Sequence, residues 1–402
     1  MTDFLLVLNA GSSSLKFSVF EAEGATPCER WRGQIEGLGT EPTFEVSEHG
    51  TRIVRTSLPH HTGPDAHRHA LSALFDWLFG VISQESLLAA GHRVVHGGGY
   101  FTTPVLIDGE TQSRIASFAP LAPLHQPHNL AGIEAVAALA PDLPQVACFD
   151  TAFHRTIPEH ATTIALPQEF RAKGIRRYGF HGLSYENVAR ALPQHLGRMP
   201  ERVVAAHLGN GASLCAMLRG ESVETTMGFT ALDGLIMGTR GGAIDPGVLL
   251  HLMQAHGLSA ADLQTLLYHR SGLFGLSGGT NDMRALLASD DAAAKLAVDC
   301  FVYRVVREIG AMAGVLGGLD ALVFTAGIGE RSAEIRKRIC ACLGWLGVRL
   351  DEAANAENRS IISAADSCVR VLVIPADEEG VIARYTLALA SRAPTKAEGA
   401  AA

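Results

Sequence analysis

Three short loops of this sequence are rich in glycine, serine and other small residues. They cover residues 9–14 (Asn-Ala-Gly-Ser-Ser-Ser), residues 207–213 (His-Leu-Gly-Asn-Gly-Ala-Ser) and residues 327–330 (Gly-Ile-Gly-Glu). Glycine lets successive backbone N–H groups turn toward one point, and serine adds a hydroxyl donor with little bulk. Loops of this composition are suited to hold a phosphate group.

None of the standard nucleotide-binding motifs matches the first two loops. The segment 9–16 lacks the spacing of a P-loop, and neither loop opens a helix as a dinucleotide-binding fingerprint does. A single hairpin of this kind is usually an ordinary turn. Two of them in the same sequence frame, with a third glycine loop that leads into a helix N-terminus, favour nucleotide binding.

Two arginines have glycines as close neighbours. Arg93 lies in the segment 91–99 (Gly-His-Arg-Val-Val-His-Gly-Gly-Gly), and Arg240 lies in 237–242 (Met-Gly-Thr-Arg-Gly-Gly). A guanidinium has a planar fork that matches the oxygens of a carboxylate or a phosphate, and small neighbours let a ligand approach it closely. For either arginine alone, a structural ion pair in a loop is the more usual interpretation.

Two carboxylates follow apolar runs that predict buried strands. Asp150 comes directly after residues 146–149, and Glu378 comes shortly after residues 371–374. A carboxylate at the end of a buried strand can hold Mg²⁺ or accept hydrogen bonds from a loop. The sequence favours neither role over the other.

The chain has 17 histidines, so only those in unusual settings are candidates for chemistry. His125 and His181 each lie beside proline or glycine next to an apolar run, which suits a hydrogen bond to a ligand. The segment 59–69 is rich in His, Pro and Gly and predicts a solvated loop rather than a metal site; its histidines are His60, His61, His67 and His69. No Gly-x-Ser-x-Gly motif is present, which disfavours a serine hydrolase.

A repeated arrangement of strands places these loops. Residues 4–8 and 15–20 predict strands around the first loop, and residues 202–206 and 214–218 predict strands around the second. We interpret the two hairpins as an internal duplication. The third loop follows a predicted strand at 321–325 and precedes a helix that Ser332 is expected to cap.

The clearest helical pattern covers residues 294–316, and two glycines end it. Its apolar positions, spaced for one helix face that packs on a sheet, are Leu296, Phe301, Val305, Ile309 and Met312. The domain boundary that the sequence supports lies near residues 149–153, between the two hairpins. We therefore expect an N-terminal domain of residues 1–150, completed by 384–402, and a C-terminal domain of residues 151–383.

Composition limits the possible classes of protein. Charged residues make up 18% of the 402 residues, which is too low for charge-driven disorder. The formal net charge of -8 argues against a nucleic-acid partner. Seven scattered cysteines fit a reducing compartment, and the N-terminal residues predict neither a signal peptide nor a membrane span. These features favour a cytoplasmic protein.

Seven ordered motifs resemble those of the acetate kinases. They occupy residues 9–17, 91–98, 149–154, 178–182, 207–213, 324–330 and 374–379 and are spread along nearly the whole sequence. The resemblance implies an α/β fold of two domains with duplicated actin-like (ribonuclease H-like) topology and a nucleotide cleft between them. This fold belongs to the superfamily of acetate and sugar kinases, heat-shock-70 proteins and actin.

The resemblance also implies an activity. It predicts reversible phosphorylation of acetate by ATP, which gives acetyl phosphate and ADP by direct in-line transfer with Mg²⁺ or Mn²⁺, in a homodimer. The nearest alternative is a propionate kinase of the same family. A nucleotide-driven interaction protein of the actin or heat-shock-70 type is more remote, because such a protein has no need of Arg93 and Arg240 for a small carboxylate.

By position, the resemblance assigns roles to individual residues. Asp150, Arg93, Arg240 and His181 would be catalytic, and His125 would lie with His181 and Arg240 near the transferred group. Asn9 and Glu378 would hold the metal. The residues implied to bind nucleotide are Asn9, Ser12, Ser14, Lys16, His207, Leu208, Gly209, Asn210, Gly211, Asp282, Met283, Arg284, Gly327, Ile328, Gly329, Glu330 and Arg331.

The remaining assignment is a pocket for the substrate. Arg93 would bind the acetate carboxylate, and the walls around its methyl group would be Val95, Leu124, Phe180 and Ala231. Ala231 replaces a usual proline, so we expect room for propionate unless the loop backbone fills the space. Further departures from the family pattern are Tyr185, Gly241, Ala243, Arg331 and Asp377, and they leave nucleotide affinity and the stiffness of the Arg240 loop open.

Overall fold

The computed structural model describes residues 2–24, 26–63 and 65–391 and divides the chain into two compact units. The first unit contains the residues up to Ala152 and the segment from Asp377 onward, and the second runs from Phe153 to Ala376. The sequence placed the return to the first domain at residue 384. The structure places it at Asp377, because the C-terminal helix α15 (Glu378–Ala390) packs on the strands of the first unit. Residues 392–402 lie outside the described residues.

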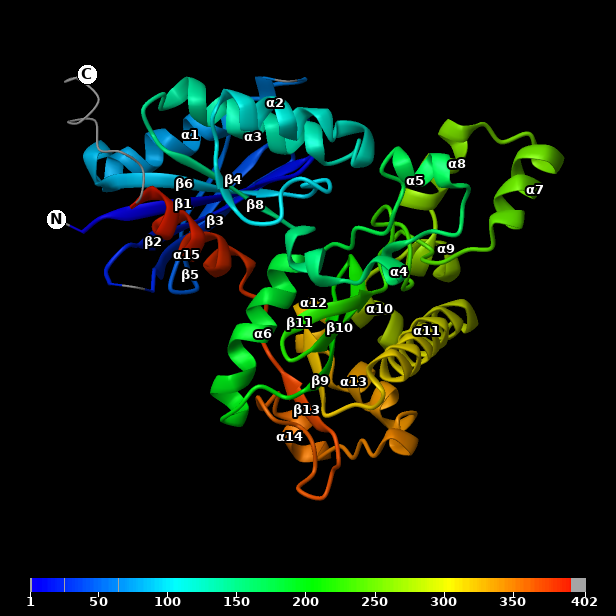
Figure 1. The fold of residues 1–402 in the computed structure, drawn as a ribbon. Helices are drawn as coiled ribbons and strands as arrows, with labels where there is room; N and C mark the ends of the chain where they lie inside the picture. The colour runs from blue at the N-terminus through cyan, green and yellow to red at the C-terminus, as the bar shows by residue number, and fades with distance from the viewer. Residues whose placement is uncertain (1, 25, 64, 392–402) are drawn as a thin grey trace. The chain divides into compact units, whose positions relative to one another are not determined.

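The first unit is built on an eight-stranded sheet with the order β5-β4-β3-β2-β1-β6-β8-β7. Figure 1 shows α1, α2 and α3 on one face of this sheet and α15 on the other. The strands are β1 (Phe4–Ala10), β2 (Ser14–Glu21), β3 (Cys28–Glu36), β4 (Thr43–Glu48), β5 (Thr51–Ser57), β6 (Leu87–Val94), β7 (Val105–Leu106) and β8 (Gln145–Phe149), and the helices besides α15 are α1 (Asp65–Val81), α2 (Gly109–Ser117) and α3 (Gln126–Leu139).

Alternation of side chains along these strands decides which of them face which helix. Leu6 and Leu8 of β1 belong to a core cluster with Leu71 and Leu74 of α1. On the opposite face, a Cβ at Gly91 of β6 would lie 2.2 Å from the hydroxyl of Thr386 in α15. Glycine is therefore required for the close approach of α15 to β6.

The second unit contains a five-stranded sheet with the order β11-β10-β9-β12-β13. Helix α6 packs on one face of this sheet, in a cluster with Val203 and Ala205 of β9, and α11 contacts β9 and β10. The strands are β9 (Arg202–Leu208), β10 (Ala212–Leu218), β11 (Glu221–Thr225), β12 (Ala321–Thr325) and β13 (Arg370–Val373). The helices are α4 (Glu159–Thr162), α5 (Gln168–Ala172), α6 (Gly182–Leu196), α7 (Pro246–His256), α8 (Ala260–His269), α9 (Gly272–Ser277), α10 (Met283–Ala288), α11 (Ala292–Leu316), α12 (Ala326–Arg331), α13 (Ala333–Ala341) and α14 (Glu352–Ala356).

The duplication expected from the two hairpins is present in the sheets. In the first unit β3, β2 and β1 are antiparallel neighbours, and β1, β6 and β8 then run parallel. In the second unit β11, β10 and β9 are antiparallel neighbours, and β9, β12 and β13 then run parallel. Each unit thus repeats the same core of five strands.

The long helix was predicted with nearly correct ends but with one wrong core residue. Helix α11 ends at Leu316, and Gly317 follows it in the left-handed conformation. Phe301, Val305, Ile309 and Met312 are buried, as expected, but Leu296 is 55% exposed. Residues three and four positions apart share a helix face, and Val298 and Ala297, which lie three and four residues before Phe301, are buried with it. Leu296 lies five residues before Phe301 and is therefore outside this face.

Two predicted loops are partly helical. The expected loop 59–69 gives way to α1 at Asp65, and His67 is buried with Nε2 hydrogen-bonded to the carbonyl oxygen of Gly11 over 2.8 Å. The buried face of α1 extends back to Ala66. Burial of this face stabilises a helix here, although the polar composition of the segment predicted a loop. The third glycine loop is itself a short helix, α12, and Ser332 caps the following helix α13 as predicted.

No helix in the described residues is apolar over a length that would cross a lipid bilayer. All seven cysteines are free thiols, as their scattered positions predicted.

Candidate functional site

The first unit brings Arg93, Asp150 and Glu378 into contact. Arg93 lies near the end of β6 and two residues after Gly91, so alternation directs it to the face covered by α15, where Glu378 opens the helix. Nε of Arg93 donates to Oδ1 of Asp150 over 3.0 Å, and Nη2 donates to Oδ2 over 2.6 Å. Nη1 lies 3.6 Å from Oε2 of Glu378. The structural ion pair that the sequence left open is therefore present for Arg93.

These charges are largely shielded from water. Asp150 is 1% exposed. Burial lowers the pKa of Arg93, but the charges of Asp150 and Glu378 outweigh this effect and raise it above the ordinary value. Burial also raises the pKa of Glu378 to about 7; Arg93 opposes this shift and Asp150 adds to it. The cluster therefore carries more buried negative charge than one arginine neutralises.

This excess of negative charge fits a divalent cation. Mg²⁺ prefers oxygen ligands and usually takes one or two protein carboxylates together with water and substrate phosphates. The side chain of Asn9 lies on the same sheet face as Arg93, because Val7 is the register partner of Gly91. The described residues hold no group of three or more His, Cys, Asp or Glu side chains that could bind a metal.

The first glycine loop joins β1 to β2 beside this face. Asn9 and Lys16 are cross-strand partners, so both side chains point to the face of Arg93. Ser12 is exposed in the turn, and Ser14 begins β2. The N–H of Gly11 donates to the carbonyl oxygen of Ser14 over 2.8 Å, which closes the turn.

Asn129 of α3 supports the site and was missed in the sequence. Its Nδ2 donates to the carbonyl oxygen of Ala10 over 3.0 Å, and its Oδ1 accepts from the N–H of Val95 over 3.0 Å. One amide therefore ties the first loop to the strand end that follows Arg93.

Two further expected site residues precede or begin α3: Leu124 is half-buried, and His125 is exposed at the N-terminus of the helix.

In the second unit, Arg240 and His181 meet at Gly211. A Cβ at Gly211 would lie 2.7 Å from Nη2 of Arg240 and 3.3 Å from Nε2 of His181. Burial lowers the pKa of Arg240, and within the described part of the chain no carboxylate forms an ion pair with it. A half-buried cation without such a partner is suited to bind an anion.

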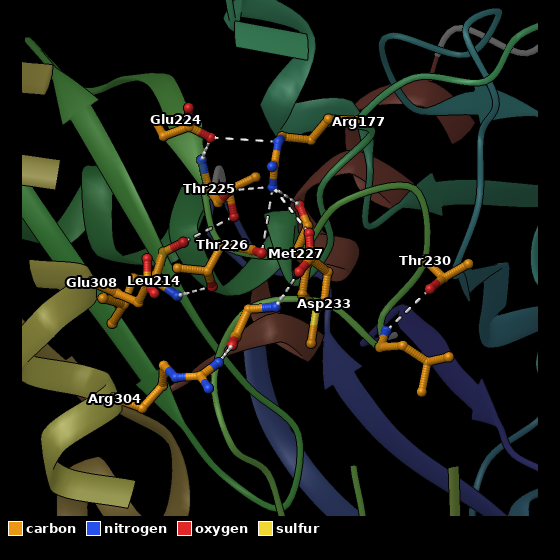
Figure 2. A network of polar contacts seen from close by, with 12 residues as sticks. Arg177, Leu214, Glu224, Thr225, Thr226, Met227, Thr230, Asp233, Arg304 and Glu308 are labelled. Carbon is orange, nitrogen blue, oxygen red and sulfur yellow. Dashed lines mark hydrogen bonds and ion pairs between the residues drawn. The ribbon is translucent and has the colours of Figure 1, made fainter. Parts of the chain in front are cut away.

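The loop before Arg240 is held by Arg177 (Figure 2). Nη1 of Arg177 donates to the carbonyl oxygens of Thr225 over 3.1 Å and Met227 over 3.3 Å, and it lies 3.7 Å from Oδ2 of Asp233. The guanidinium therefore links the end of β11 to the loop that follows it.

Arg304 of α11 holds the base of the Arg240 loop. Its Nη1 donates to the carbonyl oxygens of Gly234 over 2.9 Å and Ala243 over 3.2 Å, and the N–H of Ala243 donates to the Gly234 carbonyl oxygen over 3.0 Å. Within the loop, Nη1 of Arg240 donates to the carbonyl oxygen of Ala231 over 2.7 Å. The position of Arg240 thus depends on backbone groups that a helix fixes from outside.

A pocket of about 700 Å³ lies in the second unit. Residues from all three expected nucleotide segments of this unit line it: Gly209, Asn210, Asp282, Met283, Arg284, Gly327, Ile328 and Arg331. Gly238, Leu273 and Asn281 also line it and were not anticipated, although Asn281 directly precedes Asp282. Segments far apart in the sequence therefore form one cavity.

The wall of this pocket continues into the Arg240 loop. The N–H of Gly238 donates to the carbonyl oxygen of Asn210 over 2.9 Å, and Nδ2 of Asn281 donates to Oδ1 of Asn210 over 3.0 Å. Gly238 lies two residues before Arg240. A ligand in the pocket would therefore contact the segment that carries the guanidinium.

Five other expected nucleotide residues of this unit do not line the pocket: His207, Leu208, Gly211, Gly329 and Glu330. Nδ1 of His207 is 2.8 Å from the hydroxyl of Ser184, and Glu330 accepts from the N–H of Ala376 over 2.9 Å. Leu208 is buried in the sheet. These contacts support the loops around the pocket.

Phe180, an expected wall of the substrate pocket, is also buried, and its carbonyl oxygen is 2.9 Å from Nε2 of His154.

Comparison with known proteins agrees with this arrangement. Residues 4–384 match the model of the acetokinase family. The chain belongs to the acetokinase family. It is 52% identical to the acetate kinase of Rhodopseudomonas palustris, over 97% of this chain and 99% of that protein, and 49% identical to the acetate kinase of Rhizobium meliloti, over 97% and 99%.

Two solved structures of the family share the fold. A propionate kinase from Francisella tularensis matches with a TM-score of 0.90 and 38% identity, over 96% of this chain and 100% of that chain. The acetate kinase of Porphyromonas gingivalis matches with a TM-score of 0.88 and 38% identity, over 96% and 99%. The prediction of a two-domain actin-like fold is therefore confirmed.

Several departures from the acetokinase pattern have a structural account. Asp377 caps α15 by accepting from the N–H of Gly380 over 3.0 Å, a role that the usual asparagine can also fill. Ala243 is held through its backbone, so its small side chain does not weaken the base of the loop. Gly241 could accept a side chain only in close contact with Ile244, because its Cβ would lie 3.3 Å from that residue. Arg331 lines the pocket of about 700 Å³.

Proposed function

We propose that this chain transfers the γ-phosphoryl group of ATP to acetate, giving ADP and acetyl phosphate, and that it also catalyses the reverse reaction. The observation that carries the proposal is the meeting of Arg240 and His181 at Gly211, beside the pocket wall at Asn210 and Gly238. Full-length similarity to acetate kinases supports the choice of acetate.

Phosphoryl transfer leaves the protein little covalent chemistry, so it acts by positioning and by neutralising charge. The second unit binds nucleotide in its pocket, and Arg240 and His181 stabilise the negative charge on the transferred group. In the first unit Arg93 binds the acetate carboxylate. Asp150 holds the Arg93 guanidinium in one orientation through two hydrogen bonds. The roles of His125 and of the serines of the first loop stay predictions.

We include Mg²⁺ or Mn²⁺ in this proposal, with Glu378 and Asn9 as its protein ligands, directly or through water. When bound, the ion neutralises phosphate charge and helps to align the reacting groups. The buried, incompletely neutralised carboxylates of the first unit support this assignment.

A direct test is to measure ADP release with acetate, propionate, butyrate or no acid. We expect release that depends on both the acid and Mg²⁺, and ATP formation from acetyl phosphate and ADP in the reverse assay. Equal ADP release with and without an acid would overturn the proposal and would favour a nucleotide-driven interaction protein.

The metal assignment has its own test. Glu378→Gln should require a higher Mg²⁺ concentration for half-maximal activity and should recover in part at high Mg²⁺, because the neutral amide binds the ion more weakly. The neighbouring Glu379→Gln is a matched control and should titrate like the wild type. If Glu378→Gln loses activity without a change in its Mg²⁺ titration, Glu378 positions the loop instead.

Propionate is the second candidate substrate, and Ala231 favours it. Burying one further methylene contributes at most about 0.8 kcal/mol to binding. The loss of a proline ring from this wall leaves space for about one such group. The structural similarity to the propionate kinase of Francisella tularensis points the same way. We expect kcat/KM for propionate within about tenfold of that for acetate, and a much lower value for butyrate.

Ala231→Pro tests the wall. Proline keeps the backbone carbonyl that accepts from Arg240, so the variant should retain acetate activity and lose propionate activity selectively. Ala231→Ser, which barely changes the volume, is the control. A wild-type kcat/KM for propionate a hundredfold or more below that for acetate would mean that the loop backbone fills the space.

We also propose a homodimer in the cytoplasm. Helix α7 exposes three large apolar side chains, Val248, Leu250 and Met253, which are 49%, 56% and 43% exposed in the single chain. Seven free thiols suit a reducing compartment. Sedimentation of the purified protein should give twice the mass of 42.6 kDa, and Leu250→Glu should shift it toward the monomer.

A further inference from the structure

A buried hydroxyl pair lies behind His181. The phenol of Tyr185 and the hydroxyl of Ser213 are hydrogen-bonded, and both residues are fully buried. The same Ser213 oxygen is 2.8 Å from Nδ1 of His181. Tyr185 is therefore linked to the imidazole ring through one serine.

The fold holds these three side chains together. His181 is the N-cap residue of α6 in the left-handed conformation, with φ 58°, and the N–H of Tyr185 donates to its carbonyl oxygen over 3.1 Å. Ser213 lies on β10 as the register partner of His207, and the rings of His207 and His181 stack with centroids 4.2 Å apart. The first turn of α6 and the sheet thus fix the imidazole from two sides.

Donor and acceptor chemistry decides where the protons lie. A phenol is more acidic than an aliphatic alcohol and is the better donor, so the O–H of Tyr185 donates to the oxygen of Ser213. The O–H of Ser213 is then directed to Nδ1 of His181, which accepts. In a neutral imidazole the ring proton must then be on Nε2. Nε2 is on the side of Gly211 and Arg240, as the distances around Gly211 show.

We propose that Tyr185 is a positioning residue that acts through Ser213 to hold His181 as the Nε2–H tautomer. In this state the neutral ring donates a hydrogen bond to an anion beside Arg240. The proposal rests on the proposed function only for the identity of that anion, the phosphoryl group in transfer. Tyr185 is one of the positions at which this sequence departs from the pattern it otherwise resembles.

The tautomer can be measured without any enzymatic assay. Two-bond ¹⁵N–¹H correlation spectra of the full-length protein, labelled at histidine, distinguish a protonated from an unprotonated ring nitrogen. His181→Gln identifies the His181 signals. We expect protonated Nε2 and unprotonated Nδ1 in the wild type, and a mixture of tautomers in Tyr185→Phe and Ser213→Ala.

Kinetics give a second readout. In Tyr185→Phe we expect kcat to fall about tenfold, which corresponds to the loss of one neutral hydrogen bond, with little change in KM for ATP. Tyr178→Phe is the matched control, because the phenol of Tyr178 donates to the carbonyl oxygen of Gly174 over 2.7 Å and has no contact with Ser213 among the hydrogen bonds described. It should keep both the wild-type spectrum and the wild-type kcat.

Two results would overturn the proposal. One is a wild-type spectrum with the proton on Nδ1, which reverses the direction of both hydrogen bonds. The other is an unchanged tautomer in both Tyr185→Phe and Ser213→Ala. If the wild type shows the expected tautomer but has no kinase activity, the positioning role stands and the proposed function fails.

Discussion

At the level of single residues, the two candidate arginines differ in how their charge is compensated. Arg93 donates through Nε and Nη2 to buried Asp150, whereas Arg240 donates to a backbone carbonyl oxygen and burial lowers its pKa. The charge of Arg240 is therefore the one more available to an incoming anion. The two arginines should respond differently to removal.

Arg240→Ala should lower kcat by about 10³-fold and leave the free energy of unfolding nearly unchanged. Arg93→Ala should lose activity and also roughly 3 kcal/mol or more of stability, because it leaves a buried carboxylate unpaired. Steady-state kinetics and denaturant unfolding measure the two effects. A normal kcat with only a raised KM for acetate in Arg240→Ala would assign Arg240 to substrate binding alone. Arg240→Lys should not restore the activity, because an ammonium lacks the planar fork.

His92 should make the protein sensitive to acid. It is buried, its Nε2 is 2.7 Å from Oε1 of Gln145, and burial lowers its pKa from 6.5 to about 4. The unfolded state thus binds more protons than the folded state between pH 6.5 and pH 4, so stability falls as the pH is lowered through this range. His92→Gln should lessen that slope.

Urea unfolding at a series of pH values measures the effect on stability. His96, whose pKa burial also lowers to about 4, contributes a slope of the same sign, so part of the acid sensitivity should remain in His92→Gln. The exposed His60→Gln is the control and should leave the slope unchanged. Equal slopes for His92→Gln and wild type would show that His92 is not responsible.

At the level of elements, one helix holds the base of the Arg240 loop. Arg304 reaches from α11 to two carbonyl oxygens at the base of the segment 234–243. The apolar face of α11 packs in the core and anchors the helix, so the arginine has a rigid support. The position of the Arg240 guanidinium therefore depends on α11, none of whose residues lines the pocket of about 700 Å³.

Arg304→Met should reduce kcat by about tenfold to a hundredfold with little change in KM for ATP, because charged hydrogen bonds to the loop are lost while the pocket is unchanged. Arg307→Met is the matched control, because Arg307 is an exposed arginine of the same helix and pairs with Glu308. A rise in KM for ATP at constant kcat in Arg304→Met would contradict the positioning role.

At the level of the whole molecule, the two units have separate sheets and separate hydrophobic clusters. The residues that line the pocket of about 700 Å³, where we propose that nucleotide binds, belong to the second unit. ADP should therefore stabilise the second unit in particular, by about 2.7 kcal/mol at a concentration one hundred times its Kd.

Calorimetry with and without Mg²⁺ and ADP tests this expectation. The transition that includes the second unit should move to a higher temperature. A Cβ at Gly327 would meet nothing within 4 Å, so Gly327→Leu should fold and should fill part of the pocket. That variant should lose the ADP-induced shift. A full shift in Gly327→Leu would mean that ADP binds elsewhere.

The sequence alone predicted the features that depend on local spacing. Alternating and apolar runs located the two hairpins, the strands at β8, β12 and β13, and the ends of α11, and the glycine-rich segments located the loops that now surround the pocket. It also found Asp150 directly after β8 and Glu378 shortly after β13, where it opens α15. These features need only the period of a strand or helix and the backbone freedom of glycine.

Tertiary structure decided which distant residues meet. Arg93 contacts Asp150 because β6 and β8 are parallel neighbours, and His181 lies beside Arg240 because glycine at 211 leaves space for both. His67 and Asn129 became supports of the first loop through helix packing that no local pattern announces. The order of the strands and the packing of helices on them depend on the burial of whole faces. A pattern within one segment therefore predicts whether that segment is a helix or a strand, but the segments that it contacts are decided by the packed fold.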